Sequence, residues 1–454
     1  MRTEELYINN EDCINCWGCY NACSADAIKM KAFDGKMFPF IDSEKCIDCN
    51  KCREICVIKK EKVQQINDNS KQHIGIINLS VTHNYGAVIA AAALEQTVRE
   101  IVGKSYIVET INFAPQNEYS NKIEKLQDEI IDAWGIKLYI KNKLRAKKEN
   151  PDEKLNNAER IKKLYYFRDV FLTRGLKILR NTSEINKEKF AAFITGSDIV
   201  WAPKKLRLFG EDGYFLTFAN NGIKRIAYAP SIDCKPCRKL FRLKNSYKNN
   251  LKGFDNISVR EKSNIPFIQS LTDKKVFECC DPAFLMNADY YDEMISYSDV
   301  QNDNTPYIYV YILEVNQEIV DFANKLAKEK GLKICYFSQH HTDYEVESES
   351  CNADSPSEFL YRLKNAEYVL TNSFHCVVFS LLFKKQFLSF TRSNISIKSP
   401  DLLDKFDLKS RLVKDSASAD IDAPIDFDKV EIIIKNMRND SLDYLRNSLD
   451  SLNQ

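Results

Sequence analysis

The chain has 454 residues, of which 44% are hydrophobic and 28% are charged. This composition is typical of soluble globular proteins and excludes a disordered or collagen-like chain, and the length predicts about three domains. The 65 Lys and Arg residues balance the 64 Asp and Glu residues, so no overall charge draws the chain to nucleic acid or to an anionic membrane. The N-terminus lacks the apolar region of a signal peptide, and no apolar run is long enough to span a membrane. We therefore expect a cytoplasmic protein.

Eight of the fifteen cysteines lie in the first 56 residues, in two sets with the spacing C-x2-C-x2-C-x3-C. This spacing is typical of two [4Fe–4S] clusters, in which the fourth cysteine of each set binds the other cluster. A pair of zinc knuckles is the alternative, but zinc sites usually use two separated pairs of ligands. The predicted ligands are Cys13, Cys16, Cys19 and Cys56 for one cluster, and Cys46, Cys49, Cys52 and Cys23 for the other.

The N-terminal segment resembles a bacterial dicluster ferredoxin over about residues 5–62. It departs from that pattern at Ser24 and Val57, where proline usually follows the fourth cysteine, and at Asn50, where glycine is frequent. Asparagine tolerates positive φ better than most residues do, so the loop geometry can survive at Asn50.

The remaining chain divides into a polar linker and two α/β halves. We predict a ferredoxin domain at 1–62, a linker at 63–73, a first half at 74–300, a second half at 301–424, and C-terminal helices at 425–454 that pack back on the first half. A charged helical insertion interrupts the first half at 118–190. Its segment 141–148, KNKLRAKK, carries five cations, which indicates either a solvated helical face or a patch for lipid phosphate or an anionic membrane surface.

Apolar strand patterns alternate with helical patterns through both halves. In the first half, the strand HIGIINLS is followed by the turn His83-Asn84-Tyr85-Gly86 and a helix. Such a junction points backbone amides at an anion, although many junctions of this kind are simple connections. In the second half, strands at 306–313, 332–340 and 367–371 alternate with helices, and 425–450 is predicted to form an amphipathic helix pair. This alternation predicts two parallel sheets with a cleft where the carboxyl ends of their strands face each other.

Six motifs occur in the order, and near the form, found in the polysaccharide pyruvyl transferase family. They are HNYGAVIAAAALEQ, FITGSDIVWAPK, RIAYAPSI, ISVREKS, CCDPAFLM and TNSFHCVVFSLLFKKQF. The resemblance covers most of the chain after the linker and implies a fold of two Rossmann-like, glycosyltransferase-B-like halves. Some members of the family also carry an N-terminal dicluster ferredoxin domain. Departures are Ala90 and Ile199, where Gln is common, and Cys376, where Gly usually follows the histidine.

The resemblance implies transfer of a pyruvyl group from phosphoenolpyruvate to two hydroxyls of a sugar, as a ketal. The implied acceptor is a glycan or lipid-linked sugar in exopolysaccharide biosynthesis, handled in the cytoplasm or at the inner face of the membrane. Such a reaction needs an acid or base and a clamp for carboxylate and phosphate. The predicted catalytic residues are His375, Asp198 and Ser373, and the predicted substrate-binding residues are Arg260, Asn84, Tyr85, Gly86, Ser197, Trp201 and Asn372.

Structural alternatives exist for the main candidates. His375 could cap the helix that follows it, Asp198 could cap the next helix, and Arg260 could form an internal salt bridge with Glu261 or Asp281. A metal site formed by Cys234, Cys237 and the pair Cys279-Cys280 is a further alternative to buried free thiols.

Two other functions compete with pyruvyl transfer. In the first, the chain is an electron-transfer protein that serves a redox partner, and the large domain binds a ligand or docks. In the second, it transfers a glycosyl group from a nucleotide sugar, which fits the fold but has no signature of its own in the sequence.

Overall fold

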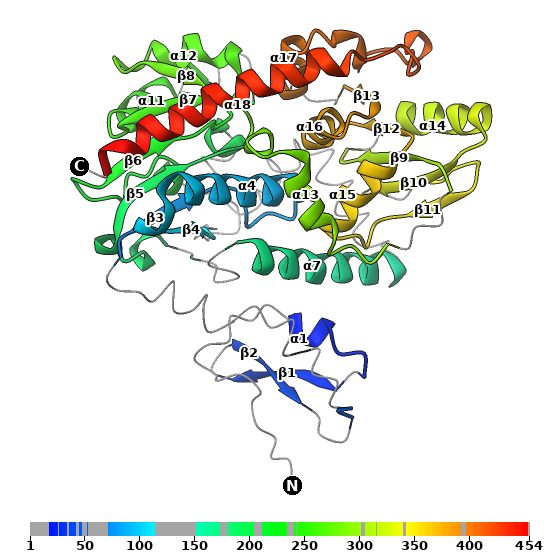
Figure 1. Cartoon of the computed structure of the whole chain (residues 1–454), viewed down its shortest axis with the longest axis horizontal. Coiled ribbons are helices and arrows are strands. Elements are labelled where there is room, and N and C mark those ends of the chain that lie inside the picture. The colour runs from blue at the N-terminus through cyan, green and yellow to red at the C-terminus, as the bar shows by residue number, and fades with distance from the viewer. Residues whose placement is uncertain are drawn as a thin grey trace, which may run out of the picture.

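The computed structural model of the chain describes residues 18–25, 27–33, 36–41, 45–47, 52, 71–113, 151–172, 179, 181–203, 211–233, 240–241, 243–300, 305–314, 316–338, 342–391 and 396–452. Cys13, Cys16, Cys49, Cys56, Cys234, Cys237 and the segment 141–148 lie outside these residues. In the N-terminal module, helix α1 (Gly18–Asn21) precedes an antiparallel hairpin of β1 (Ile28–Phe33) and β2 (Lys36–Ile41) (Figure 1).

The first large sheet has six strands in the order β4-β3-β5-β6-β7-β8, and all neighbouring strands are parallel. Its central strands are continuous apolar runs, as expected for a parallel sheet that is covered on both faces. The strands are β3 (His73–Ile77), β4 (Ile107–Ile111), β5 (Phe190–Thr195), β6 (Lys224–Ala227), β7 (Asn256–Val259) and β8 (Val276–Glu278).

The second sheet also has six parallel strands, in the order β11-β10-β9-β12-β13-β14. Taken in chain order, its strands follow the doubly wound arrangement 3-2-1-4-5-6 of Rossmann folds. The predicted α/β class with two Rossmann-like halves is therefore confirmed. The strands are β9 (Tyr307–Ile312), β10 (Lys333–Ser338), β11 (Ser348–Ser350), β12 (Tyr368–Thr371), β13 (Gln386–Phe390) and β14 (Leu412–Val413).

Helix α4 (Tyr85–Val102) lies between the two halves and is buried over most of its surface (Figure 1). Its alanine-rich sequence allows neighbouring helices to approach closely, and Asn84 caps it by accepting a hydrogen bond from the Gly86 amide. The other helices are α7 (Pro151–Phe171), α9 (Glu211–Tyr214), α11 (Lys244–Leu251), α12 (Ile265–Gln269), α13 (Ala288–Ile295), α14 (Gln317–Lys330), α15 (Pro356–Asn365), α16 (Phe374–Leu382), α17 (Lys398–Lys405) and α18 (Phe427–Leu449).

The C-terminal segment forms one long helix, α18, where the sequence pattern predicted a helix pair. No glycine or proline interrupts α18, so the helix continues to Leu449. It contacts the first half directly: the Tyr444 hydroxyl donates to the Ala227 carbonyl at 2.8 Å, and the Cys280 amide donates to Ser441 Oγ at 2.9 Å. Among the described helices, none combines the length and the apolar sequence that a membrane span requires.

Candidate active site

Three predicted site segments follow strands at the points where the strand order of each sheet reverses. The turn Asn84–Gly86 follows β3 and Asp198 follows β5 in the first sheet, while His375 follows β12 in the second. Ligands of doubly wound sheets bind at this position, beyond the carboxyl ends of the strands. The chain topology therefore brings these segments from the two halves to one place.

Gly86 lies against the imidazole ring of His375. A β-carbon at position 86 would come within 2.1 Å of His375 Cγ and 2.5 Å of Nδ1, which no side chain tolerates. Glycine is required here for this close approach. The turn of the first half thus fixes the ring at the start of α16 in the second half.

His375 is buried, with 4% of its surface exposed. Its Nε2 atom lies 3.7 Å from Asp281 Oδ2 and has no hydrogen-bond partner within the described residues. Burial lowers the pKa of His375 below 6.5, although the charges of Asp281 and Asp198 oppose this shift. The ring is therefore neutral near pH 7, with a nitrogen that can exchange a proton with a ligand.

Arg260 follows β7 and contacts three carboxylates. Nη1 donates to Asp281 at 2.7 Å, Nε donates to Glu261 at 3.0 Å, and Nη2 lies 3.4 Å from Asp198. The guanidinium carbon also lies 4.3 Å from the centroid of the Phe374 ring. Burial alone would lower the pKa of Arg260, but these carboxylates raise it, so the side chain stays charged. The internal salt bridges weighed as an alternative are both present, and they hold the guanidinium beside His375.

Asp198 adopts a positive φ of 65° directly after Ser197. Burial opposes ionisation of Asp198, but Lys398 and Arg260 hold its pKa well below the usual range. Lys398, at the start of α17, lies 3.9 Å from Asp198 Oδ1 and 3.6 Å from Asp233 Oδ2. Within the described residues, the Asp198 side chain makes no cap bond to the short helix that follows it.

A cavity of about 40 Å³ opens beside Arg260, Asp281, Phe374 and Lys398. This volume holds only a few water molecules, so a substrate requires side-chain movement or opening of the halves. Its lining also includes lysines and carboxylates, namely Lys262, Lys405, Glu278 and Asp401.

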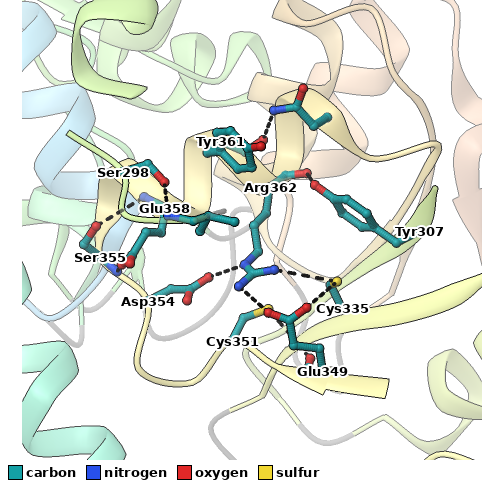
Figure 2. A network of polar contacts seen from close by, with 12 residues as sticks. Ser298, Tyr307, Cys335, Glu349, Cys351, Asp354, Ser355, Glu358, Tyr361 and Arg362 are labelled. Carbon is teal, nitrogen blue, oxygen red and sulfur yellow. Dashed lines mark hydrogen bonds and ion pairs between the residues drawn. The ribbon is translucent and has the colours of Figure 1, made fainter. Parts of the chain in front are cut away.

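Several predicted binding residues serve the framework around the site. The Tyr85 ring packs among Tyr311, Phe337 and Phe359 of the second half. Its hydroxyl donates to the carbonyl of Asp354, whose carboxylate in turn accepts a hydrogen bond from Arg362 Nε at 2.8 Å. Figure 2 shows Arg362 at the centre of this network, with Glu349 and Cys335 as further partners. Tyr85 thus ties the first half to the second.

Other predicted residues also make local contacts. Asn372 joins β12 to the loop after β9, because its side chain accepts from the Leu313 amide and donates to the Glu314 carbonyl, both at 2.8 Å. Ser197 Oγ donates to the Ala229 carbonyl at 3.0 Å. Trp201 is fully buried in the core of the first half, where it stacks on Phe215. The Ser373 hydroxyl makes no cap bond to α16 among the described residues.

Sequence reasoning did not assign site roles to Asp281, Lys398 or Asp233. Asp281 follows β8 in the motif CCDPAFL, and a polar residue after an apolar strand was the available signal. Lys398 and Asp233 carry no motif of their own. Their place in the site depends on how α17 folds over the loop after β6, which the local sequence does not indicate.

Four of the eight predicted cluster ligands lie among the described residues. Cys19 is buried and Cys23, Cys46 and Cys52 are half-buried, as cluster ligands are when the protein covers them. Cys23 Sγ accepts a hydrogen bond from the Ala27 amide at 3.2 Å, a contact that stabilises a thiolate. The described residues contain no group of three side chains that could hold a metal ion, so the cluster ligands stay a prediction from the cysteine spacing. In addition, Lys162 of α7 lies over the ring of Tyr20 in α1, with Nζ 5.3 Å from the ring centroid.

Comparison with known proteins identifies two family models in the chain. The model described as polysaccharide pyruvyl transferase matches residues 84–394, and the model described as 4Fe-4S dicluster domain matches residues 5–72. No curated protein matches the chain.

Several solved structures have a similar arrangement of elements. UDP-GlcNAc 2-epimerase from Neisseria meningitidis is 9% identical, with a TM-score of 0.40 and coverage of 81% of this chain and 93% of its own. UDP-N-acetylglucosamine 2-epimerase from Rickettsia bellii is 13% identical, with a TM-score of 0.40 and coverage of 84% and 98%. The E. coli ADP-heptose lps heptosyltransferase II is 7% identical, with a TM-score of 0.31 and coverage of 80% and 99%. Because these TM-scores are low, the similarity adds no evidence on the fold beyond the strand order of the two sheets.

Proposed function

Because the chain belongs to the polysaccharide pyruvyl transferase family, we propose that it moves a pyruvyl group from phosphoenolpyruvate to two hydroxyls of a sugar. The observation that carries this proposal is the buried Nε2 of His375, which has no hydrogen-bond partner within the described residues and lies beside the Arg260–Asp281 pair. A proton-exchanging group next to a fixed guanidinium is the combination that this reaction needs.

The reaction is balanced without an added oxidant or reductant. The methylene carbon of phosphoenolpyruvate gains a proton, and the two sugar oxygens form bonds to its neighbouring carbon. The bond from that carbon to the phosphate oxygen breaks, and phosphate leaves. Of the two hydroxyl protons, one balances the proton that the methylene gains and the other balances the one that the phosphate takes.

In this proposal, His375 accepts a hydroxyl proton in its neutral form and returns it during the same turnover. Arg260 binds the carboxylate or phosphate of the donor, and that anion replaces the longest of its three contacts, the 3.4 Å contact to Asp198. Asp198 is then free to accept a hydrogen bond from a sugar hydroxyl. The Ser373 hydroxyl, at the start of α16, supplies a further donor near His375.

The N-terminal cysteines would hold two [4Fe–4S] clusters, which supply one-electron chemistry when bound. Since the transfer reaction is redox-neutral, the clusters in this proposal have a structural or regulatory role. A redox partner of the N-terminal module is the second candidate function, and the dicluster domain match favours it. In that case, the large domain would bind a ligand or dock.

The test is an assay of phosphate release from phosphoenolpyruvate with free and lipid-diphosphate-linked sugars as acceptors. Acceptor-dependent release together with a ketal product supports the proposal. Electron transfer to a partner without phosphate release supports the second candidate instead.

A further inference from the structure

Arg168 on α7 is a buried cation that the proposed reaction does not use. None of its surface is exposed, and none of its three guanidinium nitrogens has a hydrogen-bond partner in the described part of the chain. An unpaired charge in a protein interior is strongly destabilising, so such groups normally have a counter-ion. Burial lowers the pKa of Arg168 to about 10, although the neighbouring Tyr165 and Asp169 oppose this shift. The side chain therefore remains positive at neutral pH.

The neighbours of Arg168 connect it to the turn before α4. Its guanidinium carbon lies 5.5 Å from the ring centroid of Tyr165, and that ring contacts His83 edge-on at 6.4 Å. Arg160 lies about two helical turns before Arg168 on α7, and its Nη1 donates to the His83 carbonyl at 3.3 Å. His83, Arg160 and Arg168 thus form a basic cluster at the positive end of an 18-residue helix.

The three side chains of this basic cluster differ in solvent exposure. His83 is exposed, Arg160 is half-buried and Arg168 is fully buried. Partial burial of the ring and the positive charges of Arg160 and Arg168 lower the pKa of His83. The two guanidinium charges of Arg160 and Arg168 outnumber the one carboxylate charge of Asp169 beside Arg168, and His83 at the edge of the cluster is exposed. Net positive charge next to an exposed residue at a helix N-terminus is a property of anion sites.

We propose that His83, Arg160 and Arg168 bind a phosphoryl or diphosphoryl group. His83 lies three residues before Gly86, which is in the first turn of α4 and lies against His375. Which substrate carries this anion rests on the proposed transfer reaction. In that reaction, the anion is either the diphosphate of a linked acceptor or the phosphate of the donor.

Isothermal titration of the full-length protein with its clusters tests the site, with inorganic pyrophosphate and phosphoenolpyruvate as probes. Arg168→Met and Arg160→Met each remove one cation of the cluster, and Arg446→Met, at an exposed arginine of α18, is the matched control. We expect pyrophosphate binding to weaken by about tenfold or more in the two cluster variants and to stay unchanged in the control. Unchanged phosphoenolpyruvate binding in the cluster variants would assign the site to the acceptor diphosphate, and an equal loss would assign it to the donor phosphate.

Two further measurements separate this site from a structural role of Arg168. Arg168→Met alone would leave the buried carboxylate of Asp169 without the cation beside it, so stability without ligand is compared in Arg168→Met/Asp169→Asn. This double variant should melt at the same or a higher temperature than the parent, because it removes both buried charges. Pyrophosphate should raise the pKa of His83, followed by NMR, in the parent but not in Arg168→Met. Failure of pyrophosphate to bind the parent, or equal binding by all variants, would overturn the proposal. Pyrophosphate binding that depends on Arg168, without phosphate release from phosphoenolpyruvate, would instead contradict the proposed reaction and leave the site intact.

Discussion

Gly86 of the first half and His375 of the second are in direct contact, and the contact leaves no space for a β-carbon at position 86. Gly86 lies in the first turn of α4, which follows β3, and His375 lies in the first turn of α16, which follows β12, so the position of the ring depends on how the halves meet. The candidate active site is therefore a product of both halves, and the closest contact within it is between a glycine and an imidazole.

Gly86→Ala should displace the His375 ring and lower the rate by about a hundredfold, since a misplacement of about 1 Å has an effect of that size. Gly253→Ala is the matched control, because a β-carbon there meets only the flexible end of Arg225 at 2.4 Å. Phosphate release by the two purified variants checks the prediction. Equal activity of Gly86→Ala and the parent would show that the ring position does not matter for the reaction.

Arg260→Lys should weaken use of phosphoenolpyruvate while the fold is retained. Lysine keeps the charge but loses the planar arrangement of donors, so the expected loss in kcat/KM corresponds to roughly 1.5–3 kcal/mol. Steady-state kinetics measure it, and circular dichroism controls for folding. Unchanged kinetics would show that Arg260 does not bind the donor and only forms its salt bridges to Asp281 and Glu261.

The lowered pKa of His375 predicts how stability depends on pH. The unfolded chain titrates this residue near 6.5 and the folded protein at a lower pH, so the unfolded state binds more protons between these values. The contribution of His375 to stability is therefore complete above about pH 6.5 and is lost as pH falls through the folded pKa. Urea unfolding between pH 5 and 7.5 should show a larger gain of stability with rising pH in the parent than in His375→Gln, because His83 and Asp354, whose pKa values are also shifted, titrate in both proteins. A smaller gain in the parent than in the variant would mean that the charged ring is the stable form.

Anaerobically purified protein should contain about eight iron and eight sulfide per chain, because eight thiolates at these spacings hold two [4Fe–4S] clusters. Cys23→Ser should damage the cluster that Cys46, Cys49 and Cys52 are predicted to bind, since the fourth ligand is exchanged between the sets. Metal and sulfide analysis with visible absorption measures both. Stoichiometric zinc without a chromophore would contradict the assignment.

The sequence was sufficient for the fold class because apolar strands and helices alternate regularly, and parallel connections place the polar strand ends together. Asn84–Gly86, Asp198, Arg260 and His375 were predicted as candidates because each lies in a motif that resembles the family's and follows a strand. Long-range packing was not accessible by this reasoning. Lys398 reaches the site only because α17 folds over the loop of Asp233, and Trp201 lies in the core although its motif follows a site residue.

The C-terminal helix and α7 illustrate the same limit. The sequence pattern predicted a helix pair over 425–450, but α18 is continuous from Phe427 to Leu449 because no glycine or proline opposes helical geometry in it. The charged sequence of α7 was consistent with a solvated face and gave no sign that Arg168 would be fully buried. Burial depends on the neighbouring elements, and these are distant in sequence.

Phosphate release from phosphoenolpyruvate in the parent and in His375→Gln tests the central claim most directly. Glutamine preserves size and some hydrogen bonding but cannot exchange the proton, so the rate should fall by about two to four orders of magnitude while substrate binding changes little. The variant should keep both clusters, because the N-terminal module binds iron without this histidine. A parent protein that releases no phosphate with any sugar acceptor, yet passes electrons from its clusters to a partner, would contradict the account.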